Sequence, residues 1–513
     1  MKPNLRHLFA SIRPALTLSA GLLLSIFNQP RSTAFAQGSL TPPGPPGPTM
    51  KTLTQIEPRT PISSLPYTIA SAGAYYLTTN LTGVSGSNGI TIAANDVILD
   101  LKGFSLVGGP GSFTGILVSG NRTNLWIGSG TIRGWGQEGI DGTTAQSSVF
   151  ADLKIIGSGD VGLRSGTAAQ VTRCTAIGNS QEGILTFDGC VISQCAAGNN
   201  GASGIYAGGN SRITDCPVRF NGYNGITASS GCSISGCTSA NNNNSGISTD
   251  TGGSISHCTA AANLVRGIDV GAASSVTHCT VLGTGNYGST ELLYFGIIAG
   301  DGSVVANCTI RNYDGVPGGA TSTSGIFVKN NCTVNGCSAS ANRIGVFTGS
   351  NCVVTACSAG GNASYGIYLG AYSTAKACAV STNGFQGIDA YGGYSTVDGC
   401  TASGNKNSGI ALDGDGNVVL NNTCDGNGTG LTLQAGILCF IGSRERIEGN
   451  HFSNNNLRGL YVDSSSTHNI ITRNIAITNS IQTIGYDVNT ANNDVGPIGR
   501  AATATSPWAN LQY

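Results

Sequence analysis

The sequence predicts an all-β fold: a single-stranded, right-handed parallel β-helix, which is a solenoid with about 21 residues and three short strands in each coil. Three columns of residues predict it. A glycine followed by isoleucine or a near equivalent recurs every 21 residues from Gly162, a cysteine keeps the same interval from Cys174, and an asparagine follows that cysteine by five residues. Self-similarity at a fixed period of this length indicates a solenoid.

The residues between the markers indicate strands and exclude a helical solenoid. Apolar and polar residues alternate, as in Cys-Ser-Ile-Ser-Gly-Cys at 232–237. This is the periodicity of a strand. Equivalent residues of successive coils then stack ~4.8 Å apart, the distance between hydrogen-bonded strands. We expect a right-handed coil because crossovers between parallel strands nearly always have that hand.

Each column continues through most of the chain, with two longer steps near its middle. The glycines are Gly162, Gly183, Gly204, Gly225, Gly246, Gly267, Gly325, Gly345, Gly366, Gly387 and Gly409. The cysteines are Cys174, Cys195, Cys216, Cys237, Cys258, Cys279, Cys308, Cys337, Cys357, Cys378 and Cys400. The asparagines are Asn179, Asn200, Asn221, Asn242, Asn263, Asn342, Asn362, Asn383 and Asn405.

Two further columns predict which way the chain faces in each coil. The residue after each marker glycine and the residue three before each marker cysteine are apolar, so we expect both to point into the core. The residue just before the cysteine is Gly, Asn, Asp or His in seven coils. These residue types tolerate a positive φ, so a tight left-handed turn is predicted there.

The N-terminal region predicts export. In residues 1–36, Lys2, Arg6 and Arg13 precede an apolar run, and Ala34-Phe35-Ala36 offers a cleavage site for a signal peptide. The apolar run is too short to span a bilayer, and no later stretch predicts a transmembrane segment. Residues 37–61 read as a Pro/Gly-rich linker, residues 62–490 as the β-helix and residues 491–513 as a C-terminal capping tail.

The charge excludes some partners. Without residues 1–36 the chain has 21 basic and 25 acidic residues, a net charge of −4. A sparsely charged, weakly acidic chain argues against nucleic acid and against an anionic membrane surface.

Three segments carry a family resemblance. They are Ala74-Tyr-Tyr-Leu-Thr-Thr-Asn-Leu-Thr-Gly83, Asp96-Val-Ile-Leu-Asp-Leu-Lys-Gly-Phe104 and Gly130-Thr-Ile-Arg-Gly-Trp135, together with the ending Val495-Gly-Pro-Ile498 and Ser506-Pro-Trp-Ala-Asn510. The chain resembles secreted bacterial right-handed β-helix repeat proteins of the pectate-lyase-like superfamily. The resemblance implies this fold and export. It implies no particular reaction, because most such proteins have none assigned.

The cysteine column predicts a stack of buried thiols. Exported cysteines often form disulfides, but neighbours in a parallel column have Cβ atoms ~4.8 Å apart, too far for a bridge. We therefore expect mostly reduced thiols, with Cys332 and Cys352 as the candidate exception. Helices of the resembled superfamily commonly carry an asparagine ladder at this turn, and the column becomes asparagine at Asn422, Asn450 and Asn474.

Two sets of residues suggest a metal. His257 and His278 would stack on successive coils beside two cysteines, which invites a metal interpretation; the alternative is that both are turn residues. The segment Asp413-Gly-Asp415-Gly-Asn417 could hold calcium through oxygen ligands, although any turn uses the same residues. We predict no metal site, with calcium as an unproven alternative.

Aromatic residues predict a binding surface on the first strand of the coil. Two residues after the marker glycine lie Phe327, Phe347 and Tyr368, and four residues after it lie Lys329 and Tyr391. Rings stacked about 5 Å apart on an outward face could pack against sugars. Two inserted loops, near Gly283–Phe295 and Asn312–Ser324, would stand beside these rings. The sequence leaves open whether the loops cover the rings or wall a binding groove.

Two aspartate pairs are the catalytic candidates. Asp250 with Asp269, and Asp389 with Asp413, are each one coil apart and two residues along. A separation of roughly 8 Å suits an inverting glycosidase. Against catalysis, the chain lacks the Gly-His-Gly, Asn-Thr-Asp and Asp-Pro-His motifs of enzymes in the resembled superfamily, and we expect no basic residue beside an acidic cluster.

The sequence therefore supports two hypotheses. The favoured one is a secreted or cell-surface β-helix that binds extracellular polysaccharide, or serves as a scaffold, without catalysis. The alternative is a polysaccharide lyase or a glycoside hydrolase acting on the outward face of the first sheet. Ice binding would need a uniform threonine array, which no outward column provides. The oligomeric state is not predicted.

Overall fold

The structure is a computed structural model that describes residues 56–283, 294–313, 323–429, 434–479 and 485–513. The chain divides into two units, residues 1–57 and 58–513. The predicted signal peptide, most of the linker and most of the two inserted loops lie outside the described residues.

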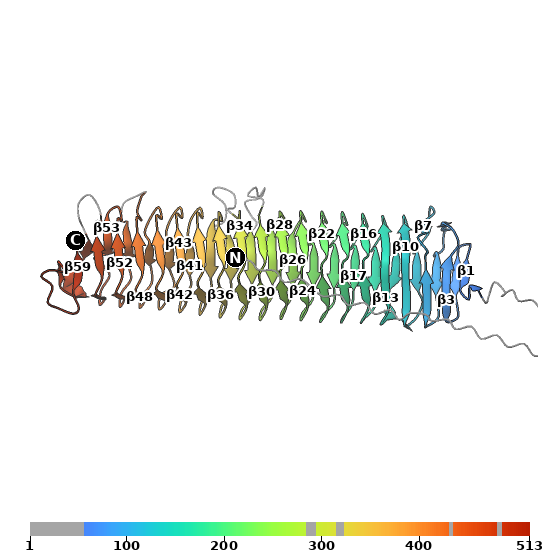
Figure 1. The fold of residues 1–513 in the computed structure, drawn as a ribbon, viewed down its shortest axis with the longest axis horizontal. Coiled ribbons are helices and arrows are strands. Elements are labelled where there is room, and N and C mark those ends of the chain that lie inside the picture. Colours follow the sequence, from blue (N-terminus) through green and yellow to red (C-terminus); the bar gives the residue numbers. More distant parts are fainter. Residues whose placement is uncertain (1–55, 284–293, 314–322, 430–433, 480–484) are drawn as a thin grey trace, which may run out of the picture. The chain divides into compact units, whose positions relative to one another are not determined.

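Residues 58–513 form a right-handed parallel β-helix of about 18 turns with about 22 residues per turn, which confirms the predicted fold class. Figure 1 shows the strands following one another along one axis in the order of the sequence. Each regular coil has three short strands, and each strand pairs in parallel with its equivalent in the next coil.

The first sheet contains the strand that follows each marker glycine. Its strands are β2 (Tyr67–Ile69), β5 (Ile90–Ile92), β8 (Ile116–Val118), β11 (Ile140–Gly142), β14 (Leu163–Ser165), β17 (Ile184–Thr186), β20 (Ile205–Ala207), β23 (Ile226–Ala228), β26 (Ser245–Thr249), β29 (Arg266–Val270), β32 (Phe295–Ala299), β35 (Ser324–Val328), β38 (Ile344–Thr348), β41 (Ile367–Leu369), β44 (Ile388–Ala390), β47 (Ile410–Leu412), β50 (Ala435–Cys439), β53 (Arg458–Val462) and β56 (Tyr486–Val488).

The second sheet precedes the cysteine column. Its strands are β1 (Thr60–Ile62), β3 (Gly73–Leu77), β6 (Val97–Asp100), β10 (Leu125–Arg133), β13 (Val149–Ile156), β15 (Gln170–Thr172), β18 (Val191–Ser193), β21 (Arg212–Thr214), β24 (Ser233–Ser235), β27 (Ser254–Ser256), β30 (Ser275–Thr277), β33 (Val304–Ala306), β36 (Thr333–Asn335), β39 (Val353–Thr355), β42 (Thr374–Lys376), β45 (Thr396–Asp398), β48 (Val418–Leu420), β51 (Arg446–Glu448), β54 (Ile470–Thr472) and β57 (Asp494–Val495).

The third sheet follows the cysteine column, and β10 and β13 run through both sheets. Its other strands are β4 (Leu81–Thr82), β7 (Ser105–Val107), β16 (Thr175–Ile177), β19 (Ala196–Gly198), β22 (Pro217–Arg219), β25 (Thr238–Ala240), β28 (Thr259–Ala261), β31 (Thr280–Leu282), β34 (Thr309–Arg311), β37 (Ser338–Ser340), β40 (Ser358–Gly360), β43 (Ala379–Ser381), β46 (Thr401–Ser403), β49 (Thr423–Asp425), β52 (His451–Ser453), β55 (Ile475–Ile477), β58 (Ile498–Gly499) and β59 (Asn510–Gln512). The strands β9 (Arg122–Thr123) and β12 (Ala145–Gln146) pair separately, and a 3-10 helix spans Thr490–Asn492.

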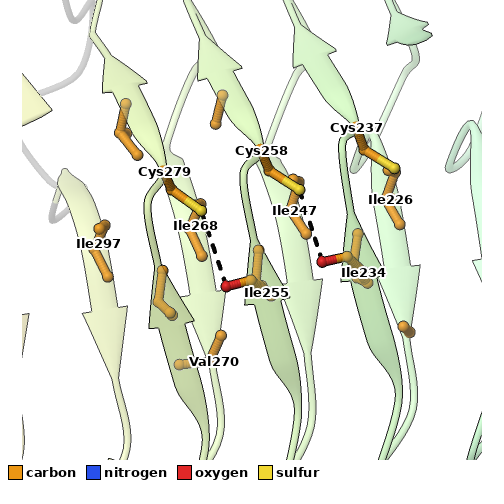
Figure 2. Packing of buried hydrophobic residues seen from close by; sticks show 14 of the residues in the cluster. Ile226, Ile234, Cys237, Ile247, Ile255, Cys258, Ile268, Val270, Cys279 and Ile297 are labelled. Carbon is orange, nitrogen blue, oxygen red and sulfur yellow. Dashed lines mark hydrogen bonds between the residues drawn. The ribbon is translucent and has the colours of Figure 1, made fainter. Parts of the chain in front are cut away.

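The core consists of straight files of aliphatic side chains. Ile205, Ile226 and Ile247 are register partners on successive strands of the first sheet, and all are fully buried. Figure 2 shows Ile226 and Ile247 of this file beside the thiols of Cys237 and Cys258. Both predicted inward columns are confirmed, because the register repeats the same apolar contact in each coil.

The turn before each marker cysteine has the predicted left-handed backbone. The φ angle is 54° at Asp215, 64° at Gly236, 53° at His257 and 54° at His278. Arg173 and Ala356, whose side chains do not favour this region, adopt it as well, with φ of 51° at each. The turn is therefore imposed by the coil and not by its own residue.

The asparagine column is a hydrogen-bonded ladder. The amide oxygen of Asn242 accepts from the backbone N–H of Asn221 at 3.0 Å and from its side-chain Nδ2 at 2.9 Å. The marker glycine lies against the ladder: a Cβ on Gly225 would lie 2.6 Å from Nδ2 of Asn242. Each coil therefore requires glycine at the first position and asparagine at the second, since a larger side chain at the glycine would displace the amide.

The cysteine column uses sulfur in the same way. The backbone N–H of Cys195 donates to Sγ of Cys216 at 3.4 Å, and the Cys216 thiol donates to the carbonyl of Thr214 at 3.1 Å. At the end of the column Asn422 takes over, accepting from the N–H of Cys400 at 2.8 Å. All 17 cysteines are free and buried, so the suggested Cys332–Cys352 bridge is wrong: the N–H of Cys332 donates to Sγ of Cys352 instead.

A third ladder, which the sequence did not predict, occupies the corner between the first and second strands. Serine, cysteine, asparagine and glutamate alternate in it: the N–H of Cys190 donates to Oγ of Ser211, and the N–H of Asn417 donates to Oε2 of Glu445 at 2.7 Å. Glu445 is buried, its Oε1 has no partner among the described residues, and burial raises its pKa to about 8.

We predict that Asn242→Ala lowers the free energy of unfolding by about 3 kcal/mol, because it leaves buried donors of Asn221 without an acceptor. The neighbouring Asn243→Ala should change it by less than about 0.5 kcal/mol, because Asn243 is exposed. Urea unfolding followed by circular dichroism measures both variants. Equal effects of the two substitutions would contradict a stabilising ladder.

We predict that Glu445 makes the free energy of unfolding depend on pH. The folded-state pKa lies above the ordinary value of 4.5, so the stability that the protonated carboxyl provides is complete below that value. It is lost as the pH rises through about 8. Glu445→Gln should therefore be more stable than the wild type at pH ~9 and should flatten the fall between those pH values. Parallel stability curves for the two proteins would refute this.

Candidate functional site

The outward face of the first sheet carries a continuous row of aromatic rings. Register partners along β32, β35, β38, β41 and β44 bring Phe327 beside Phe347, and Phe347 beside Tyr368. We call Phe295, Phe327, Phe347, Tyr368 and Tyr391 the aromatic stripe.

Ring centroids in the aromatic stripe are 5.2 Å apart for Phe327 and Phe347, 5.0 Å for Phe347 and Tyr368, and 5.3 Å for Tyr368 and Tyr391. The predicted spacing is thus confirmed, but the predicted stacking is wrong for the first two pairs, which meet edge to face with ring planes inclined by 64° and 73°. The rings of Tyr368 and Tyr391 are stacked. Phe295 is buried at one end, Phe327, Phe347 and Tyr368 are half-buried, and Tyr391 is 58% exposed at the other end. Whether the two inserted loops cover the stripe depends on residues outside the described ranges.

Asp389 lies in line with the aromatic stripe, between its register partners Tyr368 and Ala411. Its side chain is only 1% exposed, and its Oδ1 has no hydrogen-bond partner among the described residues. Burial, and then the charge of Asp413, raise the pKa of Asp389 well above its ordinary value. Burial also raises the pKa of Asp413. A buried carboxyl of this kind keeps its proton to a higher pH and can donate it.

The carboxyl pair contributes to raised pKa values at two neighbouring tyrosines, Tyr365 and Tyr368. Tyr365 lies 5.2 Å from Tyr368, ring to ring. Burial and the charges of Asp389 and Asp413 raise the pKa of Tyr365 to about 12, and raise that of Tyr368 further. Sequence reasoning missed Tyr365, which stands just before a marker glycine and not after it.

The other aspartate pair lies in a polar hollow of about 620 Å³ on the same sheet, with Asp301 and Lys329 also lining it. Asp269 forms an ion pair with Arg266, three residues earlier. The expectation that no basic residue accompanies an acidic cluster is therefore wrong here. The spacing of three residues between Arg266 and Asp269 was the sequence signal that could have predicted this ion pair. The separations of the carboxyl groups within both aspartate pairs, and their roles, stay predictions.

No cluster of His, Cys, Asp or Glu in the described ranges could hold a metal ion. The rings of His257 and His278 stack 5.0 Å apart on left-handed turn residues, which confirms the turn interpretation. At the calcium candidate, Asp415 accepts from Arg444 at 2.7 Å, and Oδ1 of Asn417 accepts from the N–H of Ser395 at 2.9 Å. These two side chains are engaged within the protein, and calcium binding by this segment stays a prediction.

The comparisons with known proteins agree with the fold. The family model described as "Right handed beta helix region" matches residues 164–293, 290–417 and 370–496. No curated protein matches the sequence. Among the described parts of the chain, no helix has the length and apolar character needed to cross a membrane.

Solved structures match at low identity. The Dettilon tailspike protein (gp208) is 16% identical over 57% of this chain and 59% of its own, with a TM-score of 0.34. The catalytic domain of Agl-KA is 12% identical over 62% of this chain and 61% of its own, with a TM-score of 0.29. A mutant of the periplasmic alginate epimerase AlgG is 11% identical over 62% of this chain and 72% of its own, with a TM-score of 0.32. These values support no conclusion about function.

We predict that Asp389→Asn stabilises the protein above neutral pH. The raised pKa means that ionising Asp389 costs free energy in the folded state, and asparagine removes that cost. The gain in unfolding free energy should grow with pH and vanish at a pH where aspartate is protonated in both states. Asp250→Asn is the control, because Asp250 is exposed. A variant less stable than the wild type at pH ~8 would contradict this assignment.

Proposed function

Because the chain belongs to the right-handed β-helix family, which its family model spans from residue 164 to residue 496, we propose that the protein binds an extracellular polysaccharide on the outward face of its first sheet. In this proposal the bound glycan lies along the aromatic stripe and is not turned over. The proposal places the protein outside the cytoplasm, on the strength of the predicted signal peptide.

The observation that carries the proposal is the aromatic stripe itself. The equivalent outward positions are polar in some coils, as in Thr227 and Ser248, and carry isolated apolar residues in others, as in Leu185. On β35, β38 and β41 the same positions hold half-buried rings in mutual contact. Exposed contiguous apolar surface marks a contact site, and aromatic rings pack against the apolar faces of sugars. The rigid stack of strands holds the rings at a fixed spacing, which suits a repeating ligand.

The second candidate function is hydrolysis or lysis of the bound glycan, and the pair Asp389 and Asp413 favours it. A carboxyl that keeps its proton can protonate a glycosidic oxygen, while a second, ionised carboxyl can activate water. In this alternative Asp389 is the acid and Asp413 is the base of an inverting glycosidase. The polar hollow with Asp250, Asp269 and Lys329 is the place where the lyase version would act.

We predict that Phe347→Ala and Tyr368→Ala each weaken binding to a polysaccharide that retards the wild type, by about threefold to tenfold. Each substitution removes one ring contact. The measurement is the retardation of the protein in gels that contain individual polysaccharides. Tyr223→Ala is the matched control, since Tyr223 is 54% exposed and lies just before β23, on a coil that precedes those of the aromatic stripe. Equal losses in all three variants, or no retardation by any polymer, would refute the proposal.

A separate assay decides between binding and turnover. The mature protein is incubated with neutral and acidic polysaccharides, and reducing ends and unsaturated products are followed. Our proposal predicts neither product. Turnover that Asp389→Asn or Asp413→Asn abolishes would establish the hydrolase alternative, and turnover lost in Asp269→Asn would point to the hollow.

A further inference from the structure

A second pair of stacked aromatic rings lies next to the aromatic stripe, at the corner between the first and second strands. The rings of Tyr372 and Tyr394 are 5.2 Å apart and inclined by only 7°. Both are well exposed, at 59% and 51%. Tyr372 follows Tyr368 by four residues and Tyr394 follows Tyr391 by three, so each stripe tyrosine leads directly into a corner tyrosine.

The backbone at this corner makes two tyrosines costly. Tyr372 has φ of 58° and Tyr394 of 53°, in the left-handed region. The equivalent residue in other coils is most often glycine or asparagine, as the following show: Gly189, Asn210, Gly231, Gly252, Gly302, Asn331, Asn351 and Gly416. A side chain with a Cβ pays on the order of 1 to 2 kcal/mol there.

The loop that carries Tyr391 and Tyr394 leaves both rings exposed. It is one residue longer than the equivalent loop of the preceding coil. Gly392 and Gly393 let it lie directly on its neighbours, because a Cβ would come 2.1 Å from N of Ala371 at the first and 2.7 Å from O of Asp415 at the second. From this loop Tyr391 stacks on Tyr368 and Tyr394 stacks on Tyr372, so one surface joins the sheet to the corner.

The charges around the corner favour a neutral ligand over an acidic one. Burial raises the pKa of Tyr368 most, and the neighbouring groups that raise it further are two carboxyl groups and two tyrosines, with no cation among them. The cation that acts on Tyr394 is Arg444, and it is already paired with Asp415 at 2.7 Å. A polyanionic chain would meet the carboxyl group of Asp413 and no unpaired cation among these groups, since the buried Asp389 keeps its proton. A neutral sugar would meet aromatic faces and phenol hydroxyls, with no charge to desolvate.

We propose that the glycan is a neutral one, and that it leaves the aromatic stripe at Tyr391 and crosses the corner over Tyr372 and Tyr394. This inference rests on the proposed function and adds to it the class of ligand and its path. The occupant of the corner is a polysaccharide of uncharged sugars, whose apolar ring faces match the parallel tyrosine rings.

The test compares an uncharged polymer with its acidic form and adds neutral polymers of other sugars. Fully methyl-esterified galacturonan, the same polymer after saponification, and neutral glucans, mannans and galactans are used in retardation gels. The wild type should be retarded by a neutral polymer and not by the saponified one. Tyr372→Gly and Tyr394→Gly should each weaken that binding about threefold to tenfold. Asn351→Gly, at the same corner one coil earlier, should have no effect on binding.

These variants keep the test interpretable. Glycine suits the left-handed backbone, so the two tyrosine variants should unfold at a temperature equal to or above that of the wild type. Binding that Phe347→Ala weakens and the corner variants leave unchanged would overturn the path and spare the proposed function. Preference for the saponified polymer would overturn the neutral class alone. Absence of all retardation would overturn both, and a corner variant that changes only the oligomeric state would show a protein contact instead.

Discussion

The structure depends on one repeated interaction at the corners of each coil. There the backbone N–H of a buried residue donates to a side-chain acceptor of the equivalent residue one coil further on, as Asn221 does to Asn242 and Cys195 does to Cys216. Without such an acceptor these buried donors would be unsatisfied, because the turn takes them out of the strand pairing. The acceptor can be an amide, a thiol, a hydroxyl or a carboxyl, which explains why the columns vary in chemistry and not in position.

This constraint produces the candidate site as well as the fold. Fixing the corners fixes the register of the strands between them, so outward residues form files as straight as the buried ones. A ring on one coil therefore meets a ring on the next, as in Phe327, Phe347 and Tyr368. The same register sets the buried Asp389 beside Tyr368 and under the influence of Asp413.

The sequence predicts those features that repeat with one residue type. The columns of glycine, cysteine and asparagine predicted the coil, the core and two ladders, and the register then predicted the ring spacing. The third ladder was missed because Ser211, Asn417 and Glu445 share a position and not a residue type. Tyr394 was missed because its loop is one residue longer than that of the preceding coil, so the repeat spacing does not align it with Tyr372. The burial of Asp389 depends on packing, which the repeat spacing does not encode.

The central claim is that a glycan occupies the surface formed by the aromatic stripe and the corner tyrosines. Hydroxyl-radical footprinting with mass spectrometry tests it most directly, by comparing tyrosine labelling with and without a retained neutral polymer. The account predicts that labelling falls at Tyr372, Tyr391 and Tyr394 and stays unchanged at Tyr223, which is exposed elsewhere. Unchanged labelling of the three tyrosines, or an equal fall at Tyr223, would contradict it.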